Sequence, residues 1–284
     1  MKYFSVCDGI GAAHVALLPL GYECVGVSEI DKNCNKLIHE KYGFTNYGDL
    51  RRWRTFTQKE FSLVIGGSPC QAFSILGHQR GFDDQRGGLT KDFIDFVCCQ
   101  TPRWFVWENV PGIFSIDNGE SFRYIIARFA ECGYGMAWRI LDAQYFGVPQ
   151  RRRRIFVVGC FGSAVGAGTV LFDGARMQVR TKKRRYKKTN HQRTDALNSQ
   201  EGCVSGTLTT NTGRIGGDRI ELLVVTDNRV RRLTPLECER LQGFPDHYTA
   251  GFSNNQRYKM LGNSMAVPVV RWIGERILKL EAGQ

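Results

Sequence analysis

Several features that define large classes of protein are missing from this chain. No apolar run approaches the roughly 18 residues needed to cross a bilayer, so we expect no membrane segment. The N-terminus, Met1 to Val6, has no basic region followed by an apolar stretch and a cleavage site, which predicts a cytoplasmic location. None of the ten cysteines belongs to a Cys-x-x-Cys pair, so no structural zinc or other metal is predicted. Most cysteines are expected to be reduced core residues.

Acidic residues are scarce relative to basic ones. The 284-residue chain has 39 Lys and Arg against 27 Asp and Glu, and this net charge of +12 indicates a polyanionic partner such as nucleic acid. Nine Lys and Arg fall between Gly174 and Thr194, where no Asp or Glu occurs. By itself such a run is as compatible with a solvated loop as with phosphate contact.

The first part of the chain alternates strand and helix patterns. Alternation of this kind predicts a mostly parallel α/β sheet with helices on both faces. The expected strands are Tyr3–Cys7, Cys24–Glu29, Phe61–Ile65, Trp104–Trp107 and Arg154–Gly159, and the first expected helices cover about Gly11–Leu18 and Asp31–Tyr42.

The pattern changes after Cys160, where glycine-rich and basic segments run to about Asn228 with short strand-like pieces such as Ile220–Val225. This stretch predicts a smaller, irregular domain. Helix signals return at Thr234-Pro235-Leu236-Glu237, a capping box with proline at the first helical position. A last helix is expected over Pro268–Leu280.

A glycine turn, Asp8-Gly9-Ile10-Gly11, follows the first expected strand. Glycines here let the backbone pass close to a bound nucleoside, although the turn lacks the third glycine of the dinucleotide fingerprint. The second expected strand ends in Glu29, which can accept hydrogen bonds from ribose hydroxyls or serve as a helix-start acid. Asp49 could follow a third strand and accept from an adenine amino group. Their order favours a nucleoside cofactor.

A cysteine stands in a second distinctive turn, Gly66-Gly67-Ser68-Pro69-Cys70-Gln71. A buried strand ends in glycines here, at the edge where α/β sheets place ligands. The following polar loop from Gly77 to Gly88 carries four glycines, so it could close as a lid. We therefore interpret Cys70 as a reactive thiol and not as an inert core residue.

Two further motifs follow expected strands or begin them. Glu108, in Glu108-Asn109-Val110, would be flanked by aromatics and partly desolvated, which raises the pKa of its carboxyl group and keeps it protonated; the simpler alternative is a turn cap. In Gln150-Arg151-Arg152-Arg153-Arg154, strand alternation puts Gln150, Arg152 and Arg154 on one face.

Together these motifs resemble the cytosine-C5 DNA methyltransferase family. They occur in family order over nearly the whole length: Asp8-Gly9-Ile10-Gly11, Glu29, Gly48-Asp49-Leu50, Pro69-Cys70-Gln71, Gly88-Leu89, Glu108-Asn109-Val110, Gln150-x-Arg152-x-Arg154, Arg240-Leu241-Gln242-Gly243-Phe244-Pro245 and Gly262-Asn263-Ser264. The resemblance implies a Rossmann-like methyltransferase sheet in a catalytic domain, residues 1–160 completed by 255–284. It also implies a smaller irregular target recognition domain with a hinge at 161–254.

The resemblance implies a chemistry that suits these residues. Cytosine C5 is a poor nucleophile, and addition of the Cys70 thiolate at C6 would turn the ring into an enamine that takes a methyl group. Glu108 would hold N3 and the exocyclic amine, while Arg152 and Arg154 would orient the base and favour the thiolate. The base must be flipped out of the duplex, and the loop from Ser74 to Gly88 would close on it.

The implied cofactor is S-adenosylmethionine, with S-adenosylhomocysteine as product. The residues that match its site are Asp8, Gly9, Ile10, Gly11, Glu29, Ile30, Asp49, Leu50, Pro69, Leu89, Asn263 and Ser264. Two positions depart from the family: Cys7 stands where an aromatic residue is usual, which removes a stacking contact of about 1 kcal/mol, and Ala12 replaces a common glycine.

The implied partner is double-stranded DNA in a bacterial cell or a phage-infected host. The residues expected to contact DNA are Gln71, Ser74, Gln150, Lys182, Arg184, Arg185, Thr207, Leu208 and Arg214, with Thr209–Arg219 as the expected base-reading segment. A monomer is expected, with a restriction endonuclease only as a possible genetic partner.

Three alternatives remain open. A transfer RNA methyltransferase shares these catalytic motifs but typically carries a Cys-Phe-Thr tripeptide, which this chain lacks. A nicotinamide-dependent oxidoreductase would explain Asp8–Gly11 and Glu29 but leaves Cys70 and Glu108 without a purpose. A catalytically silent DNA-binding module would not need Cys70, Glu108 or Arg152.

Overall fold

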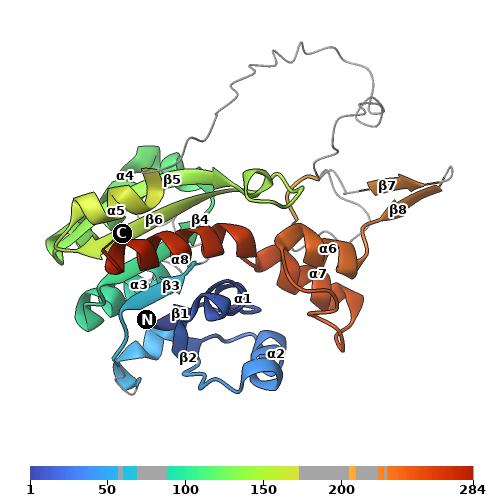
Figure 1. Cartoon of the computed structure of the whole chain (residues 1–284), viewed down its shortest axis with the longest axis horizontal. Coiled ribbons are helices and arrows are strands. Elements are labelled where there is room, and N and C mark those ends of the chain that lie inside the picture. The colour runs from blue at the N-terminus through green and yellow to red at the C-terminus, as the bar shows by residue number, and fades with distance from the viewer. Residues whose placement is uncertain (57–59, 69–87, 173–204, 209–222, 227–228, 284) are drawn as a thin grey trace, which may run out of the picture.

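A computed structural model of the chain describes residues 1–56, 60–68, 88–172, 205–208, 223–226 and 229–283 (Figure 1). Cys70 and its loop, the basic run at 174–194 and the segment 209–219 therefore lie outside the described residues. Within the described part, no helix combines the length and apolar character needed to cross a membrane.

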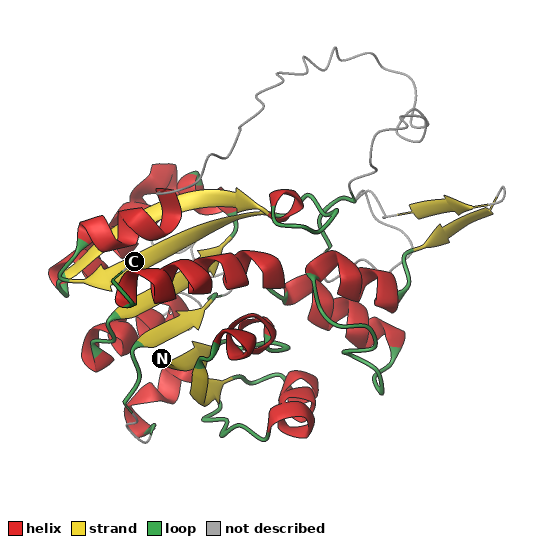
Figure 2. Cartoon of the chain, in the orientation of Figure 1, coloured by secondary structure: helices red, strands yellow, loops and turns green. Residues whose placement is uncertain are grey.

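A six-stranded sheet forms the centre of the molecule (Figure 2). Its strands lie in the order β2-β1-β3-β4-β6-β5. The pairs among β2, β1, β3 and β4 are parallel, whereas β6 runs antiparallel to both of its neighbours. The bounds are β1 Lys2–Val6, β2 Glu23–Ser28, β3 Leu63–Gly66, β4 Trp104–Asn109, β5 Tyr134–Asp142 and β6 Arg153–Phe161. The predicted mostly parallel α/β sheet is confirmed, and β5 is a strand that the sequence pattern did not reveal.

Strand alternation divides the core into two layers. Tyr3, Ile65 and Val106 face one side, which is covered mainly by α1 Ala12–Leu17, α2 Lys32–Tyr42, α5 Ala164–Phe172 and α8 Val267–Glu281. Phe4, Val64 and Phe105 face the other side, which is covered by α3 Gly88–Gln100, α4 Glu120–Glu131 and the 3-10 helix η2 Leu50–Thr55. The prediction of helices on both faces is confirmed.

The remaining elements are short or lie towards the C-terminus. They are the 3-10 helices η1 Leu18–Leu20, η4 Pro111–Phe114, η5 Ile116–Gly119 and η6 Ala143–Tyr145, the hairpin of β7 Leu223–Thr226 and β8 Arg229–Arg232, and the helices α6 Pro235–Gln242 and α7 Asn254–Asn263. The hairpin extends away from the six-stranded sheet (Figure 1).

Local sequence signals set the helix starts. The predicted capping box is present, because the Thr234 hydroxyl accepts from Glu237 N while the Glu237 carboxylate accepts from Thr234 N. Asp31 caps α2 by accepting from Asn33 N and Cys34 N. Both helices begin where the sequence predicted.

The last helix, α8, returns to the N-terminal half and packs on α1 and α5. Tyr22 donates to the Gly274 carbonyl at 2.8 Å, and Trp104 Nε1 donates to Glu281 at 2.8 Å. Because α5 also packs on β5 and β6, the layer around the sheet continues to Phe172, beyond the predicted domain end at residue 160.

Two cysteines depart from the expectation of reduced thiols. Cys98 at the end of α3 and Cys132 after α4 form a disulfide with a Cα–Cα distance of 5.5 Å. Six other cysteines of the described part are free, which agrees with the expectation that most cysteines are reduced.

Candidate active site

The glycine turn between β1 and α1 places two glycines in different surroundings. Both need a positive φ, 58° at Gly9 and 75° at Gly11, which other residues adopt only with strain. A Cβ on Gly9 would meet nothing within 4 Å, so the turn is open on that side. A Cβ on Gly11 would lie 2.6 Å from Ile38 and 2.7 Å from His14. Gly9 thus leaves room for a ligand, and Gly11 permits packing beneath the turn.

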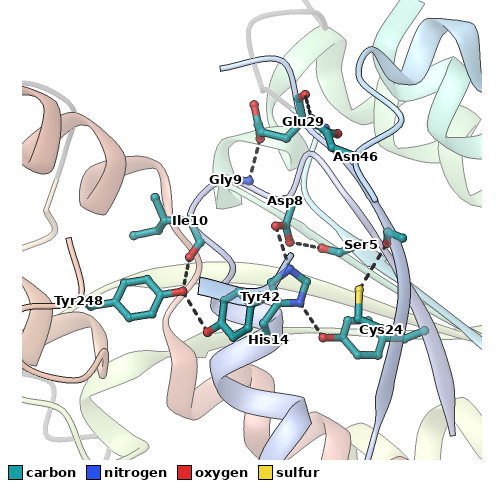
Figure 3. A network of polar contacts seen from close by, with 12 residues as sticks. Ser5, Asp8, Gly9, Ile10, His14, Cys24, Glu29, Tyr42, Asn46 and Tyr248 are labelled. Atoms are coloured by element: carbon teal, nitrogen blue, oxygen red, sulfur yellow. Dashed lines mark hydrogen bonds and ion pairs between the residues drawn. The ribbon is translucent and has the colours of Figure 1, made fainter. Parts of the chain in front are cut away.

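Glu29 follows β2 and faces this turn. One carboxylate oxygen accepts from Gly9 N at 2.7 Å (Figure 3). The other accepts from Ile30 N and Asp31 N at 2.8 Å each. Burial raises the pKa of the carboxyl group, although these three hydrogen bonds favour the charged form. A carboxylate has about four acceptor sites, so Glu29 can still accept from a hydroxyl. The adjacent Ile30 side chain is 64% exposed, as an apolar platform for a ring requires.

Asp49 differs from its predicted setting. It does not follow a strand, since Asn46 makes only an isolated bridge to Val27, and it instead caps η2. The Arg51 guanidinium binds its carboxylate at 2.6–3.0 Å and holds the pKa of that carboxyl group below its usual range. Leu50 beside it is a core residue, 1% exposed.

Two residues of the turn point into the protein. The Asp8 carboxylate contacts His14 Nε2 at 2.9 Å and accepts from the Ser5 hydroxyl at 2.5 Å (Figure 3). The Ile10 side chain is fully buried, and its carbonyl accepts from Tyr248 at 2.8 Å. Asp8 and Ile10 are both predicted cofactor-binding residues. Because their side chains support the turn from the core, only their main-chain atoms can line a ligand site.

The chain leaves β3 through Gly66-Gly67-Ser68, directly before Pro69 and Cys70, which lie outside the described residues. A Cβ on Gly66 would lie 2.1 Å from the Val6 carbonyl, and a Cβ on Gly67 would lie 2.9 Å from the Glu108 carbonyl. The two glycines are therefore required by the neighbouring strands β1 and β4 on either side.

Ser68 is buried and bound by three side chains. Its hydroxyl lies 2.7 Å from Thr90 Oγ1 and accepts from Trp107 Nε1 at 3.1 Å, while its carbonyl accepts from Asn109 Nδ2 at 3.2 Å. The start of the Cys70 loop is consequently fixed to β4 and α3. Sequence reasoning missed Thr90 and Trp107, because neither belongs to a recognisable motif.

Glu108 is the penultimate residue of β4, whereas the expected strand ends at Trp107. Arg154 Nε lies 3.2 Å from Glu108 Oε1, and the Glu108 side chain is 13% exposed. Burial raises the pKa of the Glu108 carboxyl group, and the nearby Arg154 and Arg152 charges oppose this only in part. The predicted direction of the shift is confirmed.

The alternation of Gln150, Arg152 and Arg154 is present, but the three residues have different tasks. Gln150 and Arg152 are buried and Arg154 is half-buried, whereas Arg151 and Arg153 are exposed. Arg152 donates to the main-chain carbonyls of Leu208, Gly262 and Ser264 at 3.0, 3.1 and 2.7 Å. Of the two arginines, Arg154 makes the ion pair with Glu108. The resemblance implies one shared role for Arg152 and Arg154, whereas their contacts in the structure differ.

Gln150 is fully buried, and neither its amide oxygen nor its amide nitrogen has a hydrogen-bond partner within the described structure. Such a group costs about 1–3 kcal/mol unless a ligand or water satisfies it. The predicted DNA contacts Thr207 and Leu208 have intramolecular partners: Thr207 donates to the Arg151 carbonyl at 2.6 Å, and the Leu208 carbonyl accepts from Arg152. The segment Ser205–Leu208 thus docks on Pro149–Arg152.

The other predicted residues lie as follows. Leu89 is half-buried in the first turn of α3, Asn263 is exposed at the end of α7, and Ser264 is buried beside it. α7 contacts the start of α2, since Lys259 pairs with Asp31 at 2.9 Å. The predicted residues outside the described part are Pro69, Cys70, Gln71, Ser74, Lys182, Arg184, Arg185 and Arg214.

Two described cysteines lie beside the glycine turn, Cys7 and Cys34, and both are unsuited to act as thiolates. Cys7 has a φ of 51°, and burial, with the negative charges of Glu29, Asp49 and Asp8, raises the pKa of its thiol to about 12. Burial likewise raises the pKa of the Cys34 thiol. No group of three potential metal ligands occurs in the described part.

Comparison with known families gives a match over almost the whole chain. The model for the C-5 cytosine-specific DNA methylases matches residues 1–198 and 163–279. The chain belongs to this family. It is a DNA cytosine-5 methyltransferase, and the family takes its methyl group from S-adenosylmethionine.

Individual relatives agree with this assignment. The type II methyltransferase M.HpaII of Haemophilus parainfluenzae is 31% identical, with 98% of this chain and 89% of that protein covered. The orphan methyltransferase M.Rho11sI of Bacillus phage rho11s is 37% identical over 67% of this chain and 39% of its own length. The same fold occurs in S. pombe Dnmt2, with a TM-score of 0.72, 19% identity and all of both chains covered.

Proposed function

We propose that this enzyme methylates C5 of a flipped cytosine in one short duplex DNA sequence through a covalent bond between Cys70 Sγ and C6. The observation that carries the proposal is the anchoring of Ser68, two residues before Cys70, to Asn109 and Trp107 on the strand that bears Glu108. The described segment that leads into Cys70 and the strand that bears Glu108 are therefore held together at one edge of the sheet.

The proposed reaction follows from the charges near Glu108. Attack of the Cys70 thiolate on C6 pushes electron density to N3 and C5, and the Glu108 carboxyl group, whose pKa burial raises, donates to N3 from its protonated form. Arg154 orients Glu108 and adds positive charge that favours the thiolate. S-adenosylmethionine, when bound, supplies an electrophilic methyl group for C5. Loss of the C5 proton to solvent then restores the C5–C6 double bond and expels the thiolate of Cys70, while N3 returns its proton to the Glu108 carboxylate.

The residues at the glycine turn suit a nucleoside with an adenine ring. Gly9 leaves open space, Glu29 retains acceptor capacity for ribose hydroxyls, and Ile30 exposes an apolar side chain to an adenine face. For Asp49 to accept from the adenine amino group, the Arg51 guanidinium must share or release its carboxylate. Leu89, Asn263 and Ser264 remain proposed contacts.

The proposed substrate and setting rest on charge and on the relatives. The net charge of +12 suits a polyanion, with Gln150, Lys182, Arg184 and Arg185 as proposed DNA contacts. The names of the relatives support a role in restriction-modification or in protective modification of phage DNA. A bacterial cytoplasm is the proposed location. A monomer is proposed, because methylating one base at a time needs no symmetry.

The deciding experiment measures transfer of labelled methyl groups from S-adenosylmethionine to mixed-sequence duplex DNA, followed by bisulfite sequencing. Methylated cytosines in one short context would support the proposal and give the recognition sequence. Label on transfer RNA and not on DNA would instead favour a transfer RNA substrate. No transfer to either would indicate a silent DNA-binding module.

A further inference from the structure

A buried histidine lies beneath the glycine turn and has no part in the proposed chemistry. His14 is on α1, three residues after Gly11, and is 0% exposed. Its Nε2 lies 2.9 Å from the Asp8 carboxylate (Figure 3). Its Nδ1 lies 2.6 Å from the Tyr3 hydroxyl. A histidine in the core with both ring nitrogens engaged is a fixed element of this site.

The charges around His14 favour the imidazolium form. Burial lowers the pKa of the imidazole, but the Asp8 carboxylate more than offsets this, and the pKa rises to about 9. The other groups that face the ring are Tyr3, Cys24 and the aromatic rings of Tyr42 and Phe44. Since burial also raises the pKa of Tyr3, Asp8 is the anion that balances the charge of His14.

Asp8 connects this ion pair to the turn. Its second carboxylate oxygen accepts from Ser5, its amide donates to the Ser28 carbonyl at 3.1 Å, and its carbonyl accepts from Gly11 N at 3.1 Å. Four contacts therefore fix the first residue of the turn, and the next amide, Gly9 N, is the one that donates to Glu29. Any rotation of Asp8 would displace the donor that orients the Glu29 carboxylate.

A second clamp holds the same turn from the C-terminal part of the chain. Tyr248 donates to the Ile10 carbonyl at 2.8 Å, and its hydroxyl lies 3.2 Å from the Tyr42 hydroxyl on α2. The His14 ring itself lies within contact of the turn, since a Cβ on Gly11 would be 2.7 Å from it. The turn is thus held between two buried polar groups, of which only the His14–Asp8 pair is charged.

We propose that His14 is a positioning residue for the cofactor site. Its ion pair with Asp8 fixes the Asp8–Gly11 turn, so that Gly9 and Glu29 are held in the positions that contact the nucleoside. This inference rests on the proposed function, because it takes the turn to be the S-adenosylmethionine site. It assigns part of the cofactor affinity to His14, a buried group that acts through the turn and not by contact with the cofactor.

The test measures binding of S-adenosylhomocysteine by calorimetry to the full chain. His14→Gln retains a donor but no charge, and we expect its Kd to rise about tenfold. His39→Gln is the matched control, because His39 is an exposed histidine at the end of α2, and its Kd should equal that of the wild type. An unchanged Kd in His14→Gln would overturn the inference.

The pH dependence separates positioning from simple packing. Because the folded-state pKa of His14 is raised, its contribution is present at neutral pH and is lost as the pH rises through about 9. Wild-type affinity should fall over that range more steeply than that of His14→Gln, whereas ionisation of the ligand's own amino group affects both proteins equally. Parallel profiles for the two proteins would contradict the inference.

Two further results keep the test decisive. If His14→Gln does not fold, NMR titration of the wild-type imidazole serves instead: titration near 9 supports the inference, and titration at or below the ordinary 6.5 overturns it. If the wild type methylates DNA and His14→Gln binds S-adenosylhomocysteine as tightly as the wild type does, only the role of His14 is refuted. A wild type that binds no S-adenosylhomocysteine refutes the proposed function and this inference together.

Discussion

The glycine turn (Asp8–Gly11) and the cluster around Glu108 lie at one edge of the sheet. They differ in whether their buried polar groups have hydrogen-bond partners. At the turn, Asp8, His14 and the Gly9 amide all have partners within the chain. Near Glu108 and in the segment that leads into β6, the Nε of Arg152 and the buried amide of Gln150 have none within the described structure. Because unpaired buried groups cost about 1–3 kcal/mol each, the proposed function leads us to expect that a ligand completes the second region but not the first.

This difference indicates a division of labour. The cofactor is small and always the same, so a turn fixed in advance loses little entropy on binding it. In the proposed function the flipped base arrives with a long polyanion, and groups that it alone satisfies would make its binding selective. The following changes test this contrast, in order of expected effect.

Replacing the nucleophile should have the largest effect. Cys70→Ala removes the only atom proposed to bond C6, so methyl transfer should fall by about 10⁴-fold or more. DNA binding and S-adenosylhomocysteine binding should persist. Appreciable turnover by this variant would refute the covalent mechanism.

Glu108→Gln should lower the rate of transfer by about 10²–10³-fold, because an amide cannot deliver a proton to N3. The wild-type rate should also decline as the pH rises through the raised pKa of Glu108, since the protonated carboxyl is the active form. A single-turnover assay across pH measures both. Binding of S-adenosylhomocysteine is the internal control, and its loss would contradict the separation of the two regions.

Arg152→Leu should mainly destabilise the fold. It leaves the carbonyls of Leu208, Gly262 and Ser264 without their buried donor, which should cost about 3 kcal/mol in the free energy of unfolding. Urea denaturation measures this loss. Arg154→Leu is the matched variant: it should unfold at nearly the wild-type midpoint but transfer methyl groups slowly. The reverse result would exchange the tasks assigned to the two arginines.

Glu29→Gln should weaken S-adenosylhomocysteine binding by about tenfold through loss of charged acceptors, with DNA affinity unchanged. Calorimetry with the cofactor product and gel-shift titration with duplex DNA measure the two affinities separately. A variant that lost DNA affinity instead would show that the two regions are not independent.

The smallest effect is expected from a single charge in the basic run. Lys182→Gln should lower DNA affinity a few-fold and flatten the slope of log K against log salt by about 0.9, the value for one phosphate contact. An unchanged slope would assign that part of the run to solvent.

The sequence could predict whatever depends on local pattern. Apolar runs and glycine turns located five of the six strands of the sheet, because a strand's period and its ends are properties of adjacent residues. The Thr234 capping box and the raised pKa of Glu108 followed in the same way from neighbouring residue types. β5 was missed, since its nine residues mix polar and apolar side chains at a sheet edge.

What the sequence by itself determined is the family and its chemistry, because Cys70, Glu108 and the arginines stand in motifs whose order is specific. Only the tertiary structure decided which groups Glu108 and the two arginines contact. The antiparallel pairing of β6 with β4 brings the start of β6 to the edge where β4 ends, so Arg154 meets Glu108 while Arg152 turns to the main chain. Ser68 gained its partners in the same way, through contacts with a helix and a strand distant in the chain. Such contacts leave no periodic trace in a sequence, because they depend on register and packing between elements.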